Sequence, residues 1–151
     1  MVTDRFFMEK ALSLAKEAAQ MGEVPVGAVI VKDGKIIAEG FNKREREKNA
    51  LYHAETEAIH KACNTLGTWR LSDCELYVTL EPCSMCTGTI INARLKKVVF
   101  GAYDEVAGAC LSVINMPDHF SYKGQIIGGY MEKECSEILK KFFSSLRDKQ
   151  Q

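Results

Sequence analysis

The segment in which an apolar strand gives way to a helix constrains this fold more than any other feature of the sequence. Residues 75–79 are rich in the apolar, aromatic and β-branched residues that predict a strand. Pro82 follows, and proline is tolerated in the first turn of a helix because an N–H there has no intrahelical partner. Cys83 and Cys86 then stand three residues apart. In a helical first turn both thiols are expected on one face.

The remaining elements alternate in the order typical of an α/β sheet. Helical spacing of apolar residues predicts three further helices, at residues 4–20, 53–66 and 132–147. Two β-branched runs flanking Asp33-Gly34 predict a hairpin, and a further strand is predicted at residues 97–100. Residues 102–129 are weakly periodic and rich in turn residues. This order predicts an α/β fold in three layers, with helices on both faces of a central mixed sheet.

Composition narrows the class of protein. A chain of 151 residues suits one domain, and its 20 basic and 20 acidic residues argue against a strongly basic, non-specific nucleic-acid binder. We expect no secretory signal, since the first ten residues lack a basic segment followed by an apolar one, and no membrane helix, since no apolar run reaches ~20 residues. Four of the six cysteines are expected to be buried hydrophobic residues: Cys63, Cys74, Cys110 and Cys135.

The other two cysteines combine with an upstream histidine into a candidate metal site. Thiolates are favoured at a helix N-terminus, and Cys83 and Cys86 supply half of a tetrahedral zinc site. His53 offers a third ligand, and Glu55 stands two residues further along the chain. Three protein ligands with one open position are typical of catalytic zinc, and a carboxylate beside that position can accept and deliver protons. The pair H-x-E and P-C-x-x-C is the signature of zinc deaminases.

Three other interpretations of the cysteine pair stay open. A redox Cys-x-x-Cys would give no role to His53 and Glu55. A structural zinc site would need a fourth protein ligand, for which the candidates are His60, Cys63 and Cys110. A chance pair of core cysteines would leave a buried glutamate without a role, which is energetically costly.

Nearly the whole chain resembles the bacterial tRNA adenosine deaminases, within the cytidine deaminase-like fold. The matching stretches are GEVPVGA, HAE, LGTWRL, LYVTLEPCSMC and VVFGAYD. The resemblance implies one deaminase domain over residues 1–151, built on a five-stranded sheet. It also implies one Zn²⁺ per subunit, held by His53, Cys83 and Cys86, and a cytoplasmic homodimer without a membrane partner.

The activity that the resemblance implies is conversion of the wobble adenosine of an arginine tRNA to inosine. Glu55 would be the proton shuttle, Asn42 would lie near the target base, and Asp104 would touch the neighbouring nucleotide. The backbone around Pro82 and Cys83 would shape the base pocket. We expect phosphates of the anticodon stem-loop to be bound by basic residues. The candidates are Arg94, Lys96, Lys97, Lys140, Lys141, Arg147 and Lys149.

Three segments depart from the family pattern where substrate is expected. They are Tyr52, Glu105-Val106 and Ser121-Tyr122-Lys123. These differences keep open deamination of a free nucleobase or nucleoside, of guanine or cytosine type, on the same scaffold. A third hypothesis is a zinc-stabilised RNA-binding subunit without catalysis, although it would not require Glu55.

Overall fold

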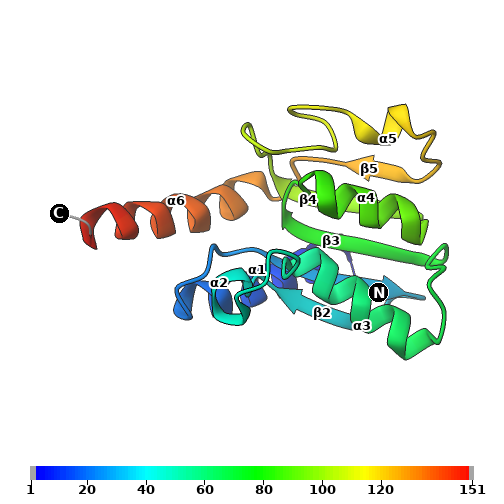
Figure 1. The fold of residues 1–151 in the computed structure, drawn as a ribbon, viewed down its shortest axis with the longest axis horizontal. Coiled ribbons are helices and arrows are strands. Elements are labelled where there is room, and N and C mark those ends of the chain that lie inside the picture. The colour runs from blue at the N-terminus through cyan, green and yellow to red at the C-terminus, as the bar shows by residue number, and fades with distance from the viewer. Residues whose placement is uncertain (1–2, 150–151) are drawn as a thin grey trace.

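Five strands form one mixed sheet in the order β2-β1-β3-β4-β5 (Figure 1). The computed structural model describes residues 3–149, so residues 1, 2, 150 and 151 of the predicted domain lie outside the described residues. β1 pairs antiparallel with β2 and β3, whereas β4 pairs parallel with β3 and β5. The strands are β1 (Gly27–Lys32), β2 (Lys35–Phe41), β3 (Cys74–Leu80), β4 (Lys97–Ala102) and β5 (Gln125–Ile127).

Helices cover both faces of this sheet and complete the three layers, which confirms the predicted fold class. The helices are α1 (Asp4–Gln20), α2 (Arg44–Glu47), α3 (Ala54–Leu66), α4 (Ser84–Ala93), α5 (Met116–His119) and α6 (Glu132–Lys149). Alternate residues of a strand face opposite sides. Ala28 and Ile30 of β1 therefore join the core under α3 and α4, whereas Val29 and Val31 join the core under α1 and α6. Among residues 3–149, no helix has the length and apolarity needed to cross a membrane.

The prediction that Pro82 lies in the first turn of a helix is wrong. Cys83 is the N-cap of α4, with extended backbone angles, and the helix begins at Ser84. The carbonyl of Pro82 instead accepts hydrogen bonds from the Thr87 hydroxyl (3.3 Å) and the Ala109 amide (2.9 Å). The proline thus lies in the junction between β3, which ends at Leu80, and α4, and it ties this junction to a distant loop.

Short elements and the last helix also differ from the predictions. The polar connector before α3 contains α2, and the weakly periodic region contains α5 and β5, which are too short for periodicity to reveal. The apolar spacing of the last helix predicts that five of its residues face the core, but only the first of them is fully buried and the last is 41% exposed: Cys135, Ile138, Leu139, Phe142 and Phe143. Helix α6 leaves the edge of the sheet and projects from the body, so only its beginning has a core to face (Figure 1).

A close approach of two backbones fixes the position of α3 on the sheet. A Cβ added at Gly40 of β2 would lie 2.4 Å from the carbonyl oxygen of Ala54 and 2.9 Å from the amide nitrogen of Ala58. Real side chains do not tolerate such distances, so only glycine allows this contact. Helix α3 begins at Ala54, so the contact at Gly40 also fixes the positions of His53, just before the helix, and of Glu55, in its first turn.

We predict that Gly40→Ala lowers the free energy of unfolding by about 1–3 kcal/mol, because the added methyl group forces α3 away from β2. Urea denaturation followed by circular dichroism measures this change. The control is Gly88→Ala in α4, where an added Cβ meets no atom within 4 Å. Alanine is the better helix former, so this variant should gain up to about 1 kcal/mol. Equal stability of Gly40→Ala and the wild type would contradict the close-contact argument.

Candidate active site

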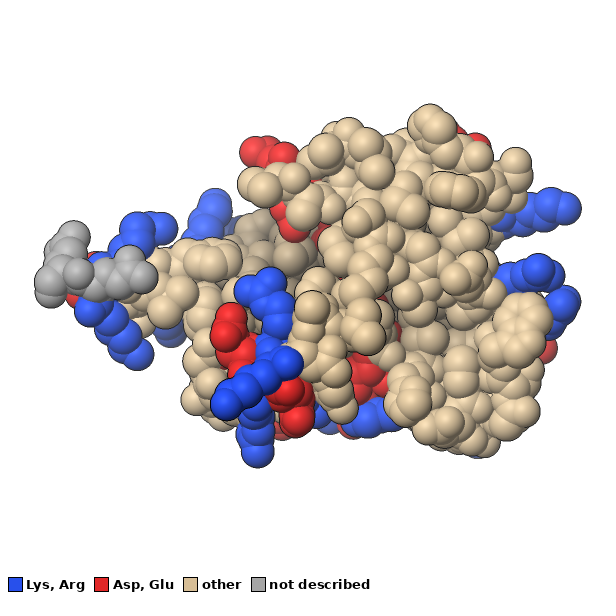
Figure 2. All heavy atoms as spheres, viewed as in Figure 1, with Lys and Arg blue, Asp and Glu red and all other residues tan. Residues whose placement is uncertain are grey.

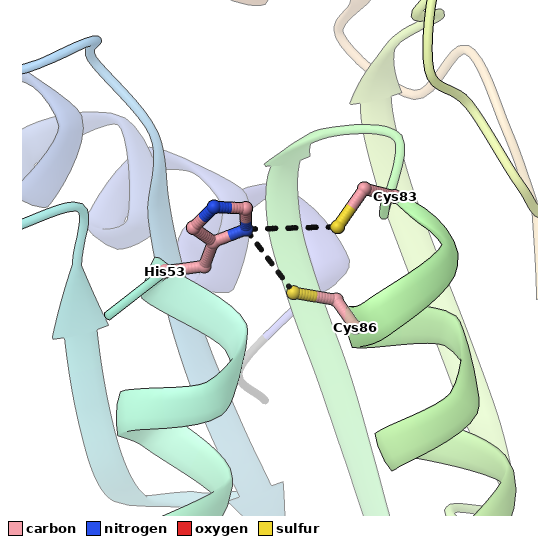
Figure 3. A group of neighbouring side chains, drawn as sticks. All are labelled: His53, Cys83 and Cys86. Atoms are coloured by element: carbon pink, nitrogen blue, oxygen red, sulfur yellow. Dashed lines mark hydrogen bonds between the residues drawn. The ribbon is translucent and has the colours of Figure 1, made fainter. Parts of the chain in front are cut away.

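The structure brings the three predicted metal ligands together at one edge of the sheet (Figure 3). The ligand atoms of His53, Cys83 and Cys86 all lie within 4.8 Å of one another. Nδ1 of His53 is 3.6 Å from Sγ of Cys83 and 3.5 Å from Sγ of Cys86. One nitrogen and two sulfur atoms thus converge on a single point from two helices.

Helix starts position these side chains. His53 is the N-cap of α3, where its backbone N–H donates to the Thr56 hydroxyl (3.1 Å), and its imidazole is left to face α4. Cys83 is the N-cap of α4, and its carbonyl accepts the amide of Thr87 (2.8 Å). Cys86 follows within the first turn and is fully buried. The positive ends of both helix dipoles therefore face the cluster, which favours negative charge on the sulfur atoms.

The protonation of the two thiols is strongly asymmetric. A hydrogen bond from Cys86 lowers the pKa of the Cys83 thiol to about 4, against the opposing effect of burial, and His53 lowers it further. The same contact with Cys83 raises the pKa of Cys86, and burial adds to the rise. The hydrogen bond to Cys83 also raises the pKa of His53. The cluster thus contains one thiolate, Cys83, which is hydrogen-bonded to Cys86 and His53. Binding of a metal ion would displace the remaining protons from these ligands.

The donor set fits a catalytic zinc ion. Two thiolates and an imidazole are ligands that zinc accepts in tetrahedral geometry. Within residues 3–149, the metal-binding group contains His53, Cys83 and Cys86 and no further ligand. His60, Cys63 and Cys110, the candidates for a fourth protein ligand, lie outside this group, and His60 instead contacts the side chain of Asn64 (3.4 Å). The three-ligand interpretation therefore fits better than a closed structural site.

Glu55 lies beside the cluster in the first turn of α3. The residue is only 4% exposed. Burial raises the pKa of its carboxyl group to about 7; the nearby Cys83 also raises it, while a backbone hydrogen bond and His53 lower it. A carboxyl group that titrates near neutrality can both accept and deliver a proton. The shuttle role of Glu55 stays a prediction, for which a buried carboxyl group with this pKa is suited.

Asn42 follows β2 directly and lies next to the segment that carries His53. The amide of Lys43 donates to the carbonyl of Tyr52 (3.1 Å), which holds the two segments together. The Asn42 side chain donates to the carbonyl of Val24 (3.2 Å) and accepts from the amide of Arg44 (3.2 Å). These bonds orient the buried Asn42 side chain within a network of backbone groups.

Asp104 follows β4 and is half-buried. One carboxylate oxygen accepts the amides of Val106 and Ala107, both at 3.0 Å, so the side chain closes a tight turn. The parallel strands β3 and β4 end at Leu80 and Ala102, which are register partners. Pro82 and Asp104 each lie two residues beyond these partners. The structure therefore places two of the predicted substrate residues at one edge of the sheet.

Three buried glutamates near the site were not predicted from the sequence. They are Glu23, which accepts the amides of Glu45 and Arg46 in α2, Glu57, which accepts the amide of Phe41 at the end of β2, and Glu81, which accepts amides of the loop after β4. Hydrogen bonds from Ser112, Leu111 and Asp104 outweigh burial and lower the pKa of Glu81, so it is a firm acceptor. The sequence does not show whether a charged residue is buried, so it gave no signal for Glu23 and Glu57. For Glu81 the one signal was its position between the predicted strand and Pro82.

The basic residues expected to meet phosphates fall into different environments. Lys97 forms an ion pair with Asp4 (3.4 Å) and is not a free cation, and Arg94 lies over the ring of Trp69. Four others are exposed on the projecting α6, where Figure 2 shows blue side chains along the helix. They are Lys140, Lys141, Arg147 and Lys149. Since β5 runs parallel to β3, α6 starts at the same edge of the sheet as the cluster.

Comparison with known proteins connects this geometry to one enzyme family. Residues 2–147 match the MafB19-like deaminase family. The tRNA-specific adenosine deaminase of Bacillus subtilis (strain 168) is 44% identical over 151 residues, covering 99% of this chain and 94% of its own. A solved tRNA:A34 deaminase superposes with a TM-score of 0.87 at 39% identity, covering 89% of this chain and 99% of its own.

The same scaffold also occurs in a solved guanine deaminase from Bacillus subtilis. It is 38% identical, with a TM-score of 0.64, and the match covers 74% of this chain and 82% of the other. The full-length matches nevertheless agree in family and in fold. The chain therefore belongs to the MafB19-like deaminase family and is a relative of the tRNA-specific adenosine deaminases over its full length.

Proposed function

We propose that this protein is a zinc-dependent hydrolase that converts the wobble adenosine of an arginine tRNA to inosine. The convergence of His53, Cys83 and Cys86 beside the buried Glu55 carries the proposal. The 44% identity to a tRNA-specific adenosine deaminase over the full chain supports the choice of substrate. A noncatalytic RNA-binding subunit would have no use for a buried carboxyl group whose pKa lies near 7.

Each residue of the cluster has a role in this reaction. His53, Cys83 and Cys86 would hold the ion, and zinc, when bound, acts as a Lewis acid that lowers the pKa of a coordinated water. Glu55 accepts one proton from the attacking water and delivers it to N1 of the adenine ring; after addition at C6 it carries a second proton, from the new C6 hydroxyl group, to the departing amine. Water adds to C6 and ammonia leaves, so the atoms balance for a hydrolysis.

The surrounding elements suit a base presented by an RNA loop. A wobble nucleotide lies in the anticodon loop, so extruding it costs less than extruding a paired base. Asn42, the backbone at Pro82 and Asp104 would line the space for the base and its neighbour. The exposed cations of α6, which begins at this same edge, would bind phosphates of the stem.

A free nucleobase or nucleoside is the second candidate substrate, supported by the 38% identity to a guanine deaminase. The sequence favours this second substrate through Tyr122, which stands where the family has a residue that is expected to face RNA. In this structure the Tyr122 hydroxyl donates to the carbonyl of Leu95, and its ring packs against the core. Tyr122 is therefore a packing residue here, and its presence does not argue for a smaller substrate.

We predict that the purified protein forms inosine in an arginine-tRNA anticodon stem-loop and leaves guanine, cytosine and free adenosine unchanged. Phosphate contacts from α6 bind the loop, whereas a free base can use none of them. Mass spectrometry of digested nucleosides and an ammonia assay measure the two classes of substrate. Release of ammonia from guanine with an unreacted stem-loop would replace the first function with the second.

We predict that Glu55→Gln lowers kcat by about 10²–10⁴-fold, because glutamine keeps the shape of the side chain but cannot shuttle a proton. Elemental analysis should still find one zinc per chain, since Glu55 is not a ligand. Cys86→Ala is the matched control: it removes a ligand and should lose both the metal and the activity. A zinc-replete Glu55→Gln variant with wild-type kcat would exclude Glu55 as the shuttle.

We also propose that residues 1–151 act as one zinc deaminase domain and that two copies associate in the cytoplasm. All five strands share a single sheet, and none of the six cysteines forms a disulfide, as is usual in a reducing compartment. Figure 2 shows a broad face over α3, α4 and α5 with few charged side chains. A groove on this face is lined by apolar side chains that include Trp69, Ile91 and Phe120, and also by the cations Arg94, Lys96 and Lys123. The rest of the face carries few charges, so the apolar surface on α4 suits a second copy of the chain.

We predict that the protein has twice the mass of one chain in solution, as measured by light scattering. Ile91→Lys places a charge on the α4 side of this face and should give monomers. Phe143→Lys, on an exposed position of α6 outside the face, should leave the dimer intact. A monomeric wild type, or a dimer that survives Ile91→Lys unchanged, would contradict the assignment of this face.

A further inference from the structure

The carboxylate of Glu81 is the acceptor around which a loop at the edge of the site is organised. Glu81 follows β3 directly and is only 2% exposed. One carboxylate oxygen accepts the amide of Asp104 (3.1 Å) and the hydroxyl of Ser112 (2.5 Å). The other accepts three successive amides, from Cys110 (3.2 Å), Leu111 (2.8 Å) and Ser112 (2.9 Å). Five donors from residues 104–112 thus converge on one side chain.

The loop closes tightly over this carboxylate. A Cβ added at Gly108 would lie 2.4 Å from a carboxylate oxygen of Glu81 and 2.5 Å from the carbonyl of Asp104. The amide of Ala109 donates to the carbonyl of Pro82 (2.9 Å), the residue after Glu81. Both ends of the loop and its middle are therefore tied to the two residues that precede Cys83.

Asp104 takes its orientation from this arrangement. Its amide is bonded to Glu81, and its carboxylate accepts the amides of Val106 and Ala107 within the same loop. Its amide also lies in the turn closed by Gly108, whose N–H donates to the Asp104 carbonyl (3.0 Å). A displacement of the loop from Glu81 would move the Asp104 carboxylate, while His53, Cys83 and Cys86 would keep their own helix positions.

We propose that Glu81 is a positioning residue that holds Asp104 and residues 104–112 against the Pro82-Cys83 turn, and thereby sets the preference for the nucleotide next to the reacting adenosine. The inference rests on the proposed function, since it assumes that the reacting base enters beside Pro82. It assigns no chemical step to Glu81, because none of its five hydrogen bonds involves a metal ligand.

The test compares Glu81→Gln with the wild type on stem-loops that differ only in the nucleotide next to the reacting adenosine. Glutamine has nearly the same volume, but its amide group donates where the loop also donates. We expect kcat/KM on the preferred stem-loop to fall by about 10²-fold, as for other misplaced substrate contacts. We also expect the ratio of kcat/KM between preferred and disfavoured stem-loops to move toward one. A purely structural defect lowers the amount of active enzyme and leaves this ratio unchanged.

A double variant tests whether Glu81 acts through Asp104. Asp104→Ala alone should move the ratio in the same direction, and Glu81→Gln added to it should change the ratio little further, because neighbouring residues in one network are not additive. Ser112→Ala removes one of the five donors and should give a smaller shift. If Glu81→Gln folds poorly, Glu81→Asp keeps the acceptor atoms on a shorter side chain and should give an intermediate ratio.

Hydrogen exchange gives a readout that does not depend on turnover. In zinc-loaded Glu81→Gln we expect faster amide exchange confined to residues 104–112, with one zinc per chain retained. Glu105→Gln, which makes the same change at an exposed site of this loop, should leave the exchange of residues 110–112 unchanged. Wild-type exchange in this loop, or an unchanged preference ratio in active Glu81→Gln, would overturn the proposal. A wild type that deaminates no stem-loop would instead overturn the proposed function, and exchange would still decide whether Glu81 holds the loop.

Discussion

The site depends on the way in which α3 and α4 flank the strand β3. Helix α3 precedes β3 and α4 follows it, and both run antiparallel to it on the same face (Figure 1). Both helices therefore begin at the carboxyl end of β3. Their N-termini bring His53 together with Cys83 and Cys86, and the positive ends of two helix dipoles favour the negative charge of the Cys83 thiolate. The parallel pairing of β3 with β4 makes this arrangement possible, since α4 must cross back over the sheet between them.

Buried carboxylates organise the loops around this edge. Glu23 accepts the amides of Glu45 and Arg46, Glu57 accepts the amide of Phe41, and Glu81 accepts four amides. The donors lie in the first turn of the short helix α2, at the end of β2 and in the loop after β4, where backbone N–H groups lack helix or sheet partners, and a buried carboxylate satisfies them. The loops near the reacting base are thus held in one geometry, which a reaction that needs close positioning of its substrate requires.

Contacts with phosphates and contacts with a second copy of the chain are expected on different parts of the surface. Exposed cations lie along α6, which projects from the sheet edge that carries the site, whereas the face over α3 and α4 carries few charges (Figure 2). Phosphate binding is electrostatic and weakens with salt, while burial of an apolar face responds little to salt. The formal net charge of +0 is therefore compatible with RNA binding, because the positive charge that matters is local.

The amino-acid sequence alone determined the layered mixed sheet, the pairing of His53 with Cys83 and Cys86, and the place of Glu55, because periodicity and ligand spacing are local properties. It did not determine the position of Pro82 before the helix, the strand β5 or the exposure of Phe143. Nor could it reveal that Glu81 holds the loop after β4. These features depend on residues far apart in the chain that meet only after folding: a three-residue strand is stabilised by its neighbour, and a buried carboxylate by amides more than twenty residues away.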